Sequence, residues 1–439
     1  NGSGNDYQLE ITKWSTTTTA NVSSFVKRDR TTALSYDGNG THKDTSEEYT
    51  YDTSSGSLTE RKLWGEVTGS TDGSFSDVSG DTITINYTYA TSSTTTAKPI
   101  ASQATYDNGS TKVAESRFYY DSQSLGSATA GNQTKAEGWI TGTTYASSTK
   151  AYNGYGLVTE ERDPRGMLTT FAYDSLNLYP ATTTNPLSHV TGRTLDYSSG
   201  KVSRTTDPNS RVYQSLYDPA DRVIAEQRPD LSSPSTLATS TSYVYVDTKG
   251  ARSTKRTDHL SSTIARDSYT YLDGLGRSIQ ERKEAEAANG YSVLDRAYNS
   301  RGLLSSESLP YFSAGTARTT ATSSSAMLIS YAYDALKRPS SITNVHGSET
   351  HAYDQWTDTA TDRNGEVKDY ISDAHGNLKQ VKEYNSGSTY TTSYTYDPLG
   401  NLTKITDALS NIRNFTYDGL SRQTESEDLH DAMDGTFGA

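Results

Sequence analysis

A pattern of tyrosine and aspartate recurs along this chain at a nearly fixed spacing. Its most regular part is the step from one turn aspartate to the next, which is 11 residues in four places. The four pairs are Asp163 and Asp174, Asp207 and Asp218, Asp362 and Asp373, and Asp407 and Asp418. Self-similarity at a fixed period is typical of stacked supersecondary units that contact only their neighbours. The sequence therefore predicts a repeat protein.

One complete unit begins with the strand that holds Tyr394, whose side chain shares a face with that of Tyr396 because the two are two residues apart. Asp397-Pro-Leu-Gly400 predicts a turn, since Asp bonds its own backbone, Pro presets φ and Gly accepts a positive φ. A second turn starts at Asp407, and the next unit reaches the equivalent point at Tyr417, 21 residues after Tyr396. The unit is thus strand, turn, strand, turn.

The framework of the repeat consists of strand tyrosines, turn aspartates and the Gly and Arg of some turns. We interpret these residues as structural, with tyrosine rings stacking from repeat to repeat and aspartates fixing the turns. The alternative is that exposed Tyr and Trp side chains stack on sugars. The framework residues are Tyr51, Asp52, Tyr152, Asp163, Tyr173, Asp174, Asp207, Tyr217, Asp218, Tyr271, Asp273, Gly276, Arg277, Tyr333, Asp334, Asp362, Asp373, Gly376, Tyr396, Asp397, Gly400, Asp407, Tyr417 and Asp418.

The composition favours a thin β structure over a conventional core. Hydrophobic residues make up 32% of the 439 residues, below the roughly 45–50% of globular proteins. There are 33 Tyr against 7 Phe, and Tyr suits a strand with one apolar and one wet side. The net charge of −13, without a basic stripe, argues against nucleic-acid binding. No run of 18 apolar residues predicts a membrane span, and the absence of Cys excludes disulfides.

Four regions are expected along the chain. Residues 1–150 carry degenerate repeats, 151–223 carry sharper ones, 224–330 interrupt the rhythm, and 331–439 resume an array that we expect to continue past the last residue. Within 224–330, Gln280–Asn289 contains strong helix formers but no apolar stripe, so a short helix and a polar strand or loop are both open. Thr316–Ala326 is another short helix or loop.

The Tyr-x-Tyr-Asp-x-x-Gly-Arg/Asn-Leu pattern resembles the bacterial Rhs, or YD-repeat, family. Residues 269–280, together with Tyr298-Asn299 and Leu309-Pro-Tyr-Phe312, are similar to the middle section of the B component of insecticidal toxin complexes, which is SpvB-like in its front part. This resemblance implies an all-β fold in which an antiparallel sheet of repeat hairpins spirals around a cavity, forming a hollow shell or β-cocoon. The family's shells hold a toxic C-terminal segment of the same or a partner chain.

No catalytic, cofactor-binding or metal-binding residue is predicted. Residues 37–48 follow some calcium-loop spacing, but His42 stands where Gly is needed, so a polar hairpin loop is expected. The seven His never reach zinc-ligand spacing, and the acidic clusters at 160–161 and 425–428 fall in repeat strands or turns. Asp397-Pro-Leu-Gly400 resembles the family's autoproteolytic site in its residue sequence only, and we interpret it as a repeat turn because the repeats continue beyond it.

Two functions from different classes remain after this screen. The first is a non-enzymatic shell segment, secreted or on the bacterial cell surface, that encapsulates a toxin or effector polypeptide. Its partners would be the remainder of a longer polypeptide and other toxin-complex subunits. The second is an extracellular fibre or adhesin with a carbohydrate- or protein-binding face, whose partners would be cell-surface glycans. An enzyme, such as a carbohydrate hydrolase, is the least favoured class, because no acid–base pair stands out.

Overall fold

The structure is a computed structural model of all 439 residues, and it describes residues 6–18, 25–78, 80–92, 98–230, 232–261, 263–286, 290–319 and 328–427. None of the described residues is helical, so none lies in a helix long and apolar enough to cross a membrane. Contacts divide the chain into two compact units. Unit 1 comprises residues 1–151, 163–166 and 349–439, and unit 2 comprises residues 152–162 and 167–348.

Unit 1 contains an N-terminal group of strands and a C-terminal group of repeat hairpins. The first group is β1 (Gln8–Thr17), β2 (Phe25–Ser35), β3 (Lys43–Tyr51), β4 (Leu58–Gly69), β5 (Phe75–Asp77), β6 (Ile83–Tyr89), β7 (Thr91–Ser92), β8 (Ile100–Tyr106), β9 (Lys112–Tyr120), β10 (Ser127–Ala128), β11 (Gln133–Thr141) and β12 (Thr144–Tyr152). The second group is β29 (Gly347–Asp354), β30 (Thr357–Thr361), β31 (Val367–Ser372), β32 (Leu378–Asn385), β33 (Ser388–Tyr396), β34 (Leu402–Thr406), β35 (Ile412–Tyr417) and β36 (Gln423–Ser426).

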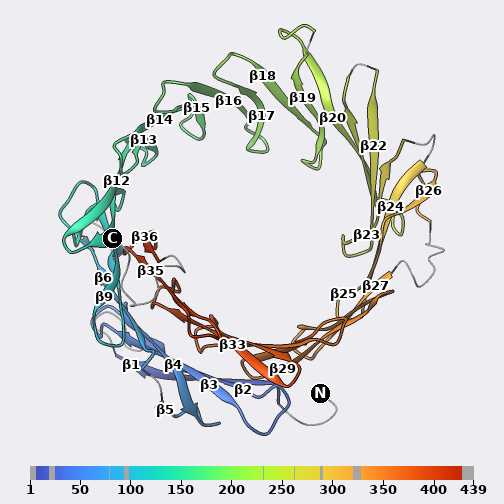
Figure 1. Ribbon diagram of the computed structural model, residues 1–439. Helices are drawn as coiled ribbons and strands as arrows, with labels where there is room; N and C mark the ends of the chain where they lie inside the picture. Colours follow the sequence, from blue (N-terminus) through green and yellow to red (C-terminus); the bar gives the residue numbers. More distant parts are fainter. Residues whose placement is uncertain are drawn as a thin grey trace. The chain divides into compact units, whose positions relative to one another are not determined.

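Unit 2 contains the remaining strands, which Figure 1 shows side by side in chain order from β13 to β22. They are β13 (Val158–Arg162), β14 (Leu168–Tyr173), β15 (Pro180–Thr184), β16 (Val190–Asp196), β17 (Lys201–Thr206), β18 (Val212–Tyr217), β19 (Val223–Pro229), β20 (Leu237–Val246), β21 (Ser253–His259), β22 (Ala265–Leu272), β23 (Ser278–Glu284), β24 (Gly290–Tyr298), β25 (Leu304–Ser308), β26 (Tyr311–Ala314), β27 (Leu328–Tyr333) and β28 (Pro339–Asn344).

Nearly every strand pairs antiparallel with its neighbour in the chain, as the hairpin repeat predicts. Local departures occur where a strand pairs with one further along the chain, as β4 does with β6 and β25 with β27. β24 pairs with both β25 and β26, and β7 pairs in parallel with β10. The helix considered at Gln280–Asn289 is wrong for its described part, because Gln280–Glu284 belongs to β23 and pairs with β24. Strand pairing on both sides satisfies this backbone, and tertiary pairing overrides helix propensity. Of Thr316–Ala326, only residues 316–319 are described, and they are not helical.

The repeat turns form as the sequence predicts. In the turn after β33, Asp397 N–H donates to the Asn401 carbonyl and Gly400 N–H donates to the Asp397 carbonyl, both at 3.0 Å. Gly400 has a φ of 80°, a left-handed conformation that glycine adopts without strain. A register irregularity precedes the turn, between Thr395 and Tyr396. A bulge of this kind twists the strand ends into the turn.

Tyrosine hydroxyls connect successive repeats. The tyrosine near the end of a strand donates to the carbonyl of the preceding paired strand at its beginning, as Tyr173 does to Val158 at 2.9 Å and Tyr333 to Leu304 at 2.8 Å. The last ladder pair of β13 and β14 is Glu160–Thr170, so the Val158 carbonyl lies beyond the ladder. The hydroxyl thus bonds a carbonyl that the ladder between these two strands does not reach. The same bond is made by Tyr89, Tyr120, Tyr217, Tyr245 and Tyr298.

For the framework tyrosines that make this bond, the finding corrects the expectation that tyrosine rings stack from repeat to repeat. Ring contacts between tyrosines occur within the described chain, for example the stacked rings of Tyr243 and Tyr245 with centroids 6.4 Å apart. Those two belong to one strand, whereas Tyr269 of β22 and Tyr291 of β24 meet edge to face between strands, with centroids 5.8 Å apart. At Tyr173 and Tyr333 the contact between strands is the hydroxyl bond.

The sheet buries few side chains completely. In the described part of unit 2, the buried hydrophobic residues are Tyr291 and Val293, and most other strand residues are half-buried or exposed. A small buried cluster in unit 1 consists of Ala90, Ala101, Tyr120 and Ala128. A two-layer protein of this length would bury a continuous apolar core. The low hydrophobic content of the sequence therefore corresponds to a thin sheet whose stability rests on its hydrogen-bond ladders.

Candidate functional site

Each turn aspartate acts as an acceptor for its own turn. In the turn at Asp273, the Oδ1 atom accepts from the backbone N–H groups of Leu275 and Arg277 at 2.8 and 3.0 Å, and Oδ2 accepts from the Arg277 guanidinium at 2.7 Å. The bonds from Arg277 hold the pKa of Asp273 below its usual value, against a smaller opposing effect of burial. At Asp407, the side chain and the backbone N–H of Asn411 lower the pKa in the same way.

The predicted framework residues lie where the repeat requires them. Every predicted aspartate stands at the first position of a turn, and the tyrosines lie at or next to the ends of their strands. Gly276, Gly376 and Gly400 have φ values of 82, 86 and 80°. The aspartates in turns are Asp52, Asp163, Asp174, Asp207, Asp218, Asp273, Asp334, Asp362, Asp373, Asp397, Asp407 and Asp418. The tyrosines at strand ends are Tyr51, Tyr152, Tyr173, Tyr217, Tyr271, Tyr333, Tyr396 and Tyr417.

A buried polar network holds residues 311–319 of unit 2 against β23. The guanidinium of Arg282, which has no exposed surface, donates to the carbonyls of Ala314 and Gly315 at 3.0 and 2.8 Å. The equally buried Gln280 donates to the Asp295 carboxylate and to the Thr319 carbonyl, both at 2.6 Å. The network thus fixes a return segment of the chain over the sheet through its backbone carbonyls.

Tyr311 extends this network at its other end. Its hydroxyl donates to Asp295 Oδ2 at 2.7 Å. Burial and this bond to a carboxylate raise the pKa of Tyr311 to about 12, so the phenol stays protonated at neutral pH. The role of these groups is to position backbone.

A seam within unit 1 joins the N-terminal strands to the C-terminal repeats. Asn39 Nδ2 donates to Asp354 Oδ1 at 2.8 Å, and the Lys43 ammonium lies 4.7 Å from the centroid of the Trp356 ring. His375 Nε2 donates to the carbonyl of Asp81 at 2.8 Å. We call this set of contacts the seam. It joins segments that lie about 300 residues apart in the sequence through polar side chains rather than through a buried apolar core.

Two cavities flank Asp81 at the seam. One has a volume of about 600 Å³ and includes His375 and Pro398 in its lining, and the other has a volume of about 440 Å³ and includes Lys43 and Trp356. Their polar lining is largely made of turn residues that already serve the repeats. The seam is therefore incompletely packed on both sides of the His375–Asp81 contact.

Where the last described repeat turn meets β11, the packing is tight. Gly419 N–H donates to the Ile140 carbonyl at 2.9 Å. A Cβ at Gly419 would lie 2.3 Å from Cε3 of Trp139, so only glycine fits at this position without movement of the indole ring. This contact fixes the C-terminal repeats on the N-terminal strands.

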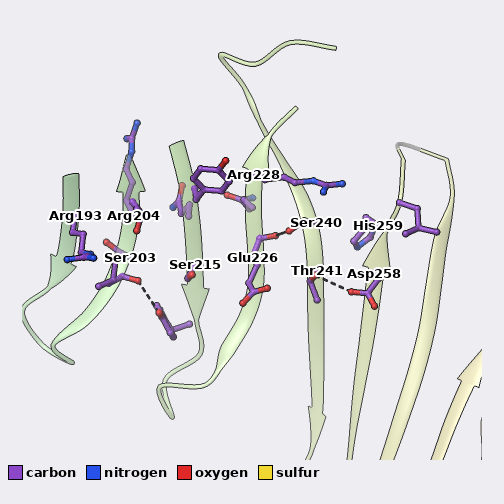
Figure 2. A pocket seen from close by; sticks show the side chains of 17 residues that line it. Arg193, Ser203, Arg204, Ser215, Glu226, Arg228, Ser240, Thr241, Asp258 and His259 are labelled. Carbon is purple, nitrogen blue, oxygen red and sulfur yellow. Dashed lines mark hydrogen bonds between the residues drawn. The ribbon is translucent and has the colours of Figure 1, made fainter. Parts of the chain in front are cut away.

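A groove of about 780 Å³ crosses the strands β16 to β21 of unit 2 (Figure 2). Successive cross-strand pairs place the side chains of Arg193 on β16, Glu226 on β19 and Asp258 on β21 on one face of the sheet. Arg228 follows Glu226 by two residues on β19 and therefore shares this face. The groove is open and polar, and its lining carries charges of both signs.

Arg204 of β17 belongs to the lining but lies on the other face of the sheet. Its neighbour Thr205 is the residue that pairs with Arg193, and successive side chains of a strand point to opposite faces. Among the described lining residues, the arginines on the face of the groove are therefore Arg193 and Arg228.

The charges of the groove are not balanced by bonds within the described chain. Asp258 is paired with Arg256 at 2.8 Å and accepts a hydrogen bond from Thr241 at 3.2 Å. Among the described residues, the side chains of Arg193, Arg228 and Glu226 make no hydrogen bond or ion pair with one another or with any other residue. Two unpaired cations thus share the groove with one unpaired carboxylate.

The sequence did not point to these groove residues or to the buried pair Gln280 and Arg282. The groove arginines belong to no sequence motif, and only strand pairing across β16 to β21 brings them to one face of the sheet. No sequence signal marks Arg282, because it lies in a run of charged residues and is buried by residues 314–319. Pairings of this kind depend on register that one sequence does not specify.

The other motifs considered lie in ordinary structural positions. The loop at 37–40 is a turn between β2 and β3, and its Asn39 serves the seam. Glu160 and Glu161 lie in β13, and Glu425 lies in β36, while Asp428 is outside the described residues. Across the part of the chain that the structure describes, no three or more His, Asp or Glu side chains gather in a way that could hold a metal ion.

A family profile described as RHS Repeat matches residues 373–412 and 396–428. This match covers the region in which the turn chemistry is most regular. A comparison with curated protein sequences gives no significant match. The recognition of Rhs repeats from the Tyr–Asp pattern is confirmed.

The fold is similar to those of solved toxin-complex structures. The crystal structure of TcdB2-TccC3 matches with a TM-score of 0.77 and 11% identity over 96% of this chain and 30% of that chain. TcdB2-TccC3 without its hypervariable C-terminal region matches with a TM-score of 0.77 at 10% identity, over 96% of this chain and 31% of that one. The Photorhabdus luminescens Tc holotoxin pore matches with a TM-score of 0.78, also at 10% identity and over 96% and 31% of the two chains.

This chain spans about a third of the length of the solved structures that it matches. At such low identity the likeness concerns the fold, and it confirms the expected all-β, antiparallel sheet of repeat hairpins. Residues 373–428 match the Rhs-repeat profile, and the chain has the fold of the TcdB2-TccC3 structures.

Proposed function

We propose that this chain is a non-enzymatic wall segment of an Rhs shell that encloses and protects a toxin or effector polypeptide. The observation that carries the proposal is the likeness of almost the whole chain to TcdB2-TccC3, combined with a thin sheet that has scarcely any buried core. A thin sheet presents two extended faces, which suits a wall better than a compact catalytic domain. The polypeptide to be enclosed would belong to the same longer chain or to a partner chain.

The chemistry of the surface supports this role. The groove of unit 2 is polar and mixed in charge, and the strands around it carry half-exposed tyrosines such as Tyr213 and exposed aliphatic residues such as Val244. Such a surface offers no single large apolar patch on which an enclosed chain would fold and remain tightly bound. An unfolded polypeptide could be held there and still be released.

Other toxin-complex subunits are the partners that we propose for the assembled protein, and a secreted, extracellular location agrees with toxin-complex relatives. The alternative of an adhesin or fibre would use the same sheet to bind glycans or proteins at a cell surface. Protection of an enclosed polypeptide distinguishes the two.

Limited proteolysis of the complete polypeptide, followed by mass spectrometry of its C-terminal segment, tests the proposal. The shell should be cut only at surface loops, and the C-terminal segment should be degraded only after the shell has been opened. The same segment prepared alone is the control, and it should be digested at once. If the segment is digested equally fast in both samples, encapsulation is excluded and the adhesin becomes the better proposal.

A further inference from the structure

We propose that the groove across β16 to β21 binds acidic stretches of the enclosed polypeptide. This inference rests on the proposed function and names the chemistry of one contact between wall and cargo. Its starting point is the pair of arginines on the face of the groove, Arg193 and Arg228, whose guanidinium groups have no partner among the described residues.

The lack of partners sets these two arginines apart from several others in unit 2. Arg222 and Arg277 pair with the aspartates of their own turns, and Arg301 donates to two backbone carbonyls of a neighbouring turn. In a chain with a net charge of −13, two free guanidinium groups on one face of a groove form a local cationic site.

The acidic residues of the groove do not cancel this charge. Asp258 is neutralised by Arg256 at 2.8 Å, so Glu226 is the carboxylate left to oppose the two arginines. Without the Asp258–Arg256 ion pair, the two arginines and Glu226 give the groove an excess of one positive charge. A ligand with several carboxylates complements that excess, and the planar fork of the Arg side chain suits carboxylates.

The dimensions fit a short extended peptide. The lining extends over six neighbouring strands, from Arg193 on β16 to Asp258 on β21. With strands about 4.8 Å apart, the groove is about 24 Å long. An extended chain advances about 3.3 Å per residue, so about seven residues of peptide lie across it. Tyr213 and Tyr217 on β18 supply apolar surface between the two arginines.

Binding of a fluorescently labelled peptide of alternating Glu and Ser to the purified 439-residue chain tests this inference. A peptide of alternating Lys and Ser of equal length is the probe of opposite charge. Fluorescence anisotropy should show saturable binding of the acidic peptide and none of the basic one. Binding should weaken strongly as salt is raised, because exposed charges are screened within about 10 Å at 0.1 M salt. A basic peptide that binds as well as the acidic one would overturn the inference.

Variants locate the contact. Replacing Arg193 and Arg228 together by Ala should weaken binding about fivefold or more, since each exposed charge contact adds a modest amount. The double Lys variant keeps the charge and should retain most of the affinity. Arg204→Ala is the matched control, because Arg204 is exposed and unpaired on a neighbouring strand but lies on the opposite face. It should change the affinity less than about twofold.

Glu226→Gln gives a result in the opposite direction. It removes the unpaired carboxylate, so the acidic peptide should bind about twofold or more tightly. Circular dichroism of each variant should match that of the wild-type chain. Unchanged affinity in both the double Ala variant and Glu226→Gln would overturn the inference. So would saturable binding of a sulfated oligosaccharide by a groove that leaves the acidic peptide unbound.

Failure of this inference can be told apart from failure of the proposed function. The double Ala variant of the complete polypeptide can be subjected to the same proteolysis as the wild type. If the C-terminal segment stays protected although the acidic peptide does not bind, the inference about the groove is wrong and the proposal of encapsulation stands.

Discussion

At the scale of single residues, the repeat depends on the carboxylates of its turns and, in several units, on a tyrosine hydroxyl. The aspartate joins the two ends of its turn, and the tyrosine of the next strand satisfies a carbonyl of the strand before it. Both roles are local and are repeated along the chain, which explains why the Tyr–Asp pair recurs while the residues between vary. Each role predicts the effect of a single substitution.

Asp397→Ala should lower the free energy of unfolding by about 1 kcal/mol. The backbone N–H groups of Leu399 and Asn401 donate to Oδ1 of Asp397, and in the variant they would form hydrogen bonds with water instead. Asp397→Asn should cost less, since Asn already fills this turn position at Asn153 and Asn299 and makes the same backbone bonds. Urea denaturation of the three proteins measures both effects. Equal losses for Ala and Asn would contradict this role of the side chain.

Tyr333→Phe should cost about 1 kcal/mol, because it leaves the Leu304 carbonyl without its donor. Tyr396→Phe is the matched control, since the structure shows no hydrogen bond from the Tyr396 hydroxyl to any described residue and the side chain borders the seam cavities. It should change stability by less than about 0.5 kcal/mol. Urea denaturation compares the two variants, and equal stabilities would contradict the role assigned to the Tyr333 hydroxyl.

At the scale of strands, charged side chains replace a hydrophobic core. On β9, Glu115 accepts from Arg117 on its own strand at 2.7 Å and from Tyr145 of β12 at 2.6 Å. Burial alone would raise the pKa of Glu115, but the hydrogen bonds from Arg117, Lys112 and Tyr145 outweigh it and lower the pKa to about 2. Such cross-strand groups take the place that aliphatic pairs hold in a sandwich.

The lowered pKa of Glu115 makes its contribution depend on pH. A carboxylate whose pKa falls on folding adds stability above its unfolded value, here 4.5, and this stability is lost as the pH falls towards the folded value of about 2. Glu115→Gln should therefore be less stable than wild type at pH 7 and lose less stability between pH 4.5 and 2. Urea midpoints measured across this range provide the test. Parallel curves for the two proteins would contradict the assignment.

Arg282 of β23 makes buried hydrogen bonds whose removal should lower the stability of the protein. Arg282→Met should lower stability by about 3 kcal/mol or more, because the carbonyls of Ala314 and Gly315 lose their donor in a buried place. Hydrogen exchange should rise in residues 311–319. Arg266→Met on the neighbouring β22, an exposed arginine, is the control and should have little effect. Similar exchange in both variants would show that Arg282 does not hold this segment.

The local sequence pattern predicted much of this structure. The features that it did not predict depend on pairing between segments that are distant in the sequence. The turn at Asp397 and the strands around it follow from residue types and spacing, since each choice of Asp, Pro and Gly is local. At Gln280–Glu284 the residue types leave a helix and a strand both open, and pairing with β24 decides for the strand. The seam between Asn39 and Asp354 joins residues 315 apart in the sequence, a contact that repeat spacing does not encode.

At the scale of the whole molecule, the two units have the properties that a wall requires. The sheet has few buried hydrophobic residues, a seam of polar contacts within unit 1 and a cationic groove in unit 2. None of these features needs a substrate to be transformed. They are the features on which we base the proposal that the chain encloses another polypeptide.

Accessibility of a single cysteine tests enclosure most directly, because the chain itself contains no Cys. One cysteine is placed in the C-terminal segment of the complete polypeptide, and its reaction with a small maleimide is compared with that of a maleimide carried on a long polyethylene glycol chain. Lys249→Cys, in an exposed turn of unit 2, is the control and should react with both reagents.

Enclosure predicts that the small reagent reaches the cysteine of the C-terminal segment while the large one reacts far more slowly, and that urea removes the difference. Equal rates for the large reagent at both cysteines in the native protein would contradict enclosure.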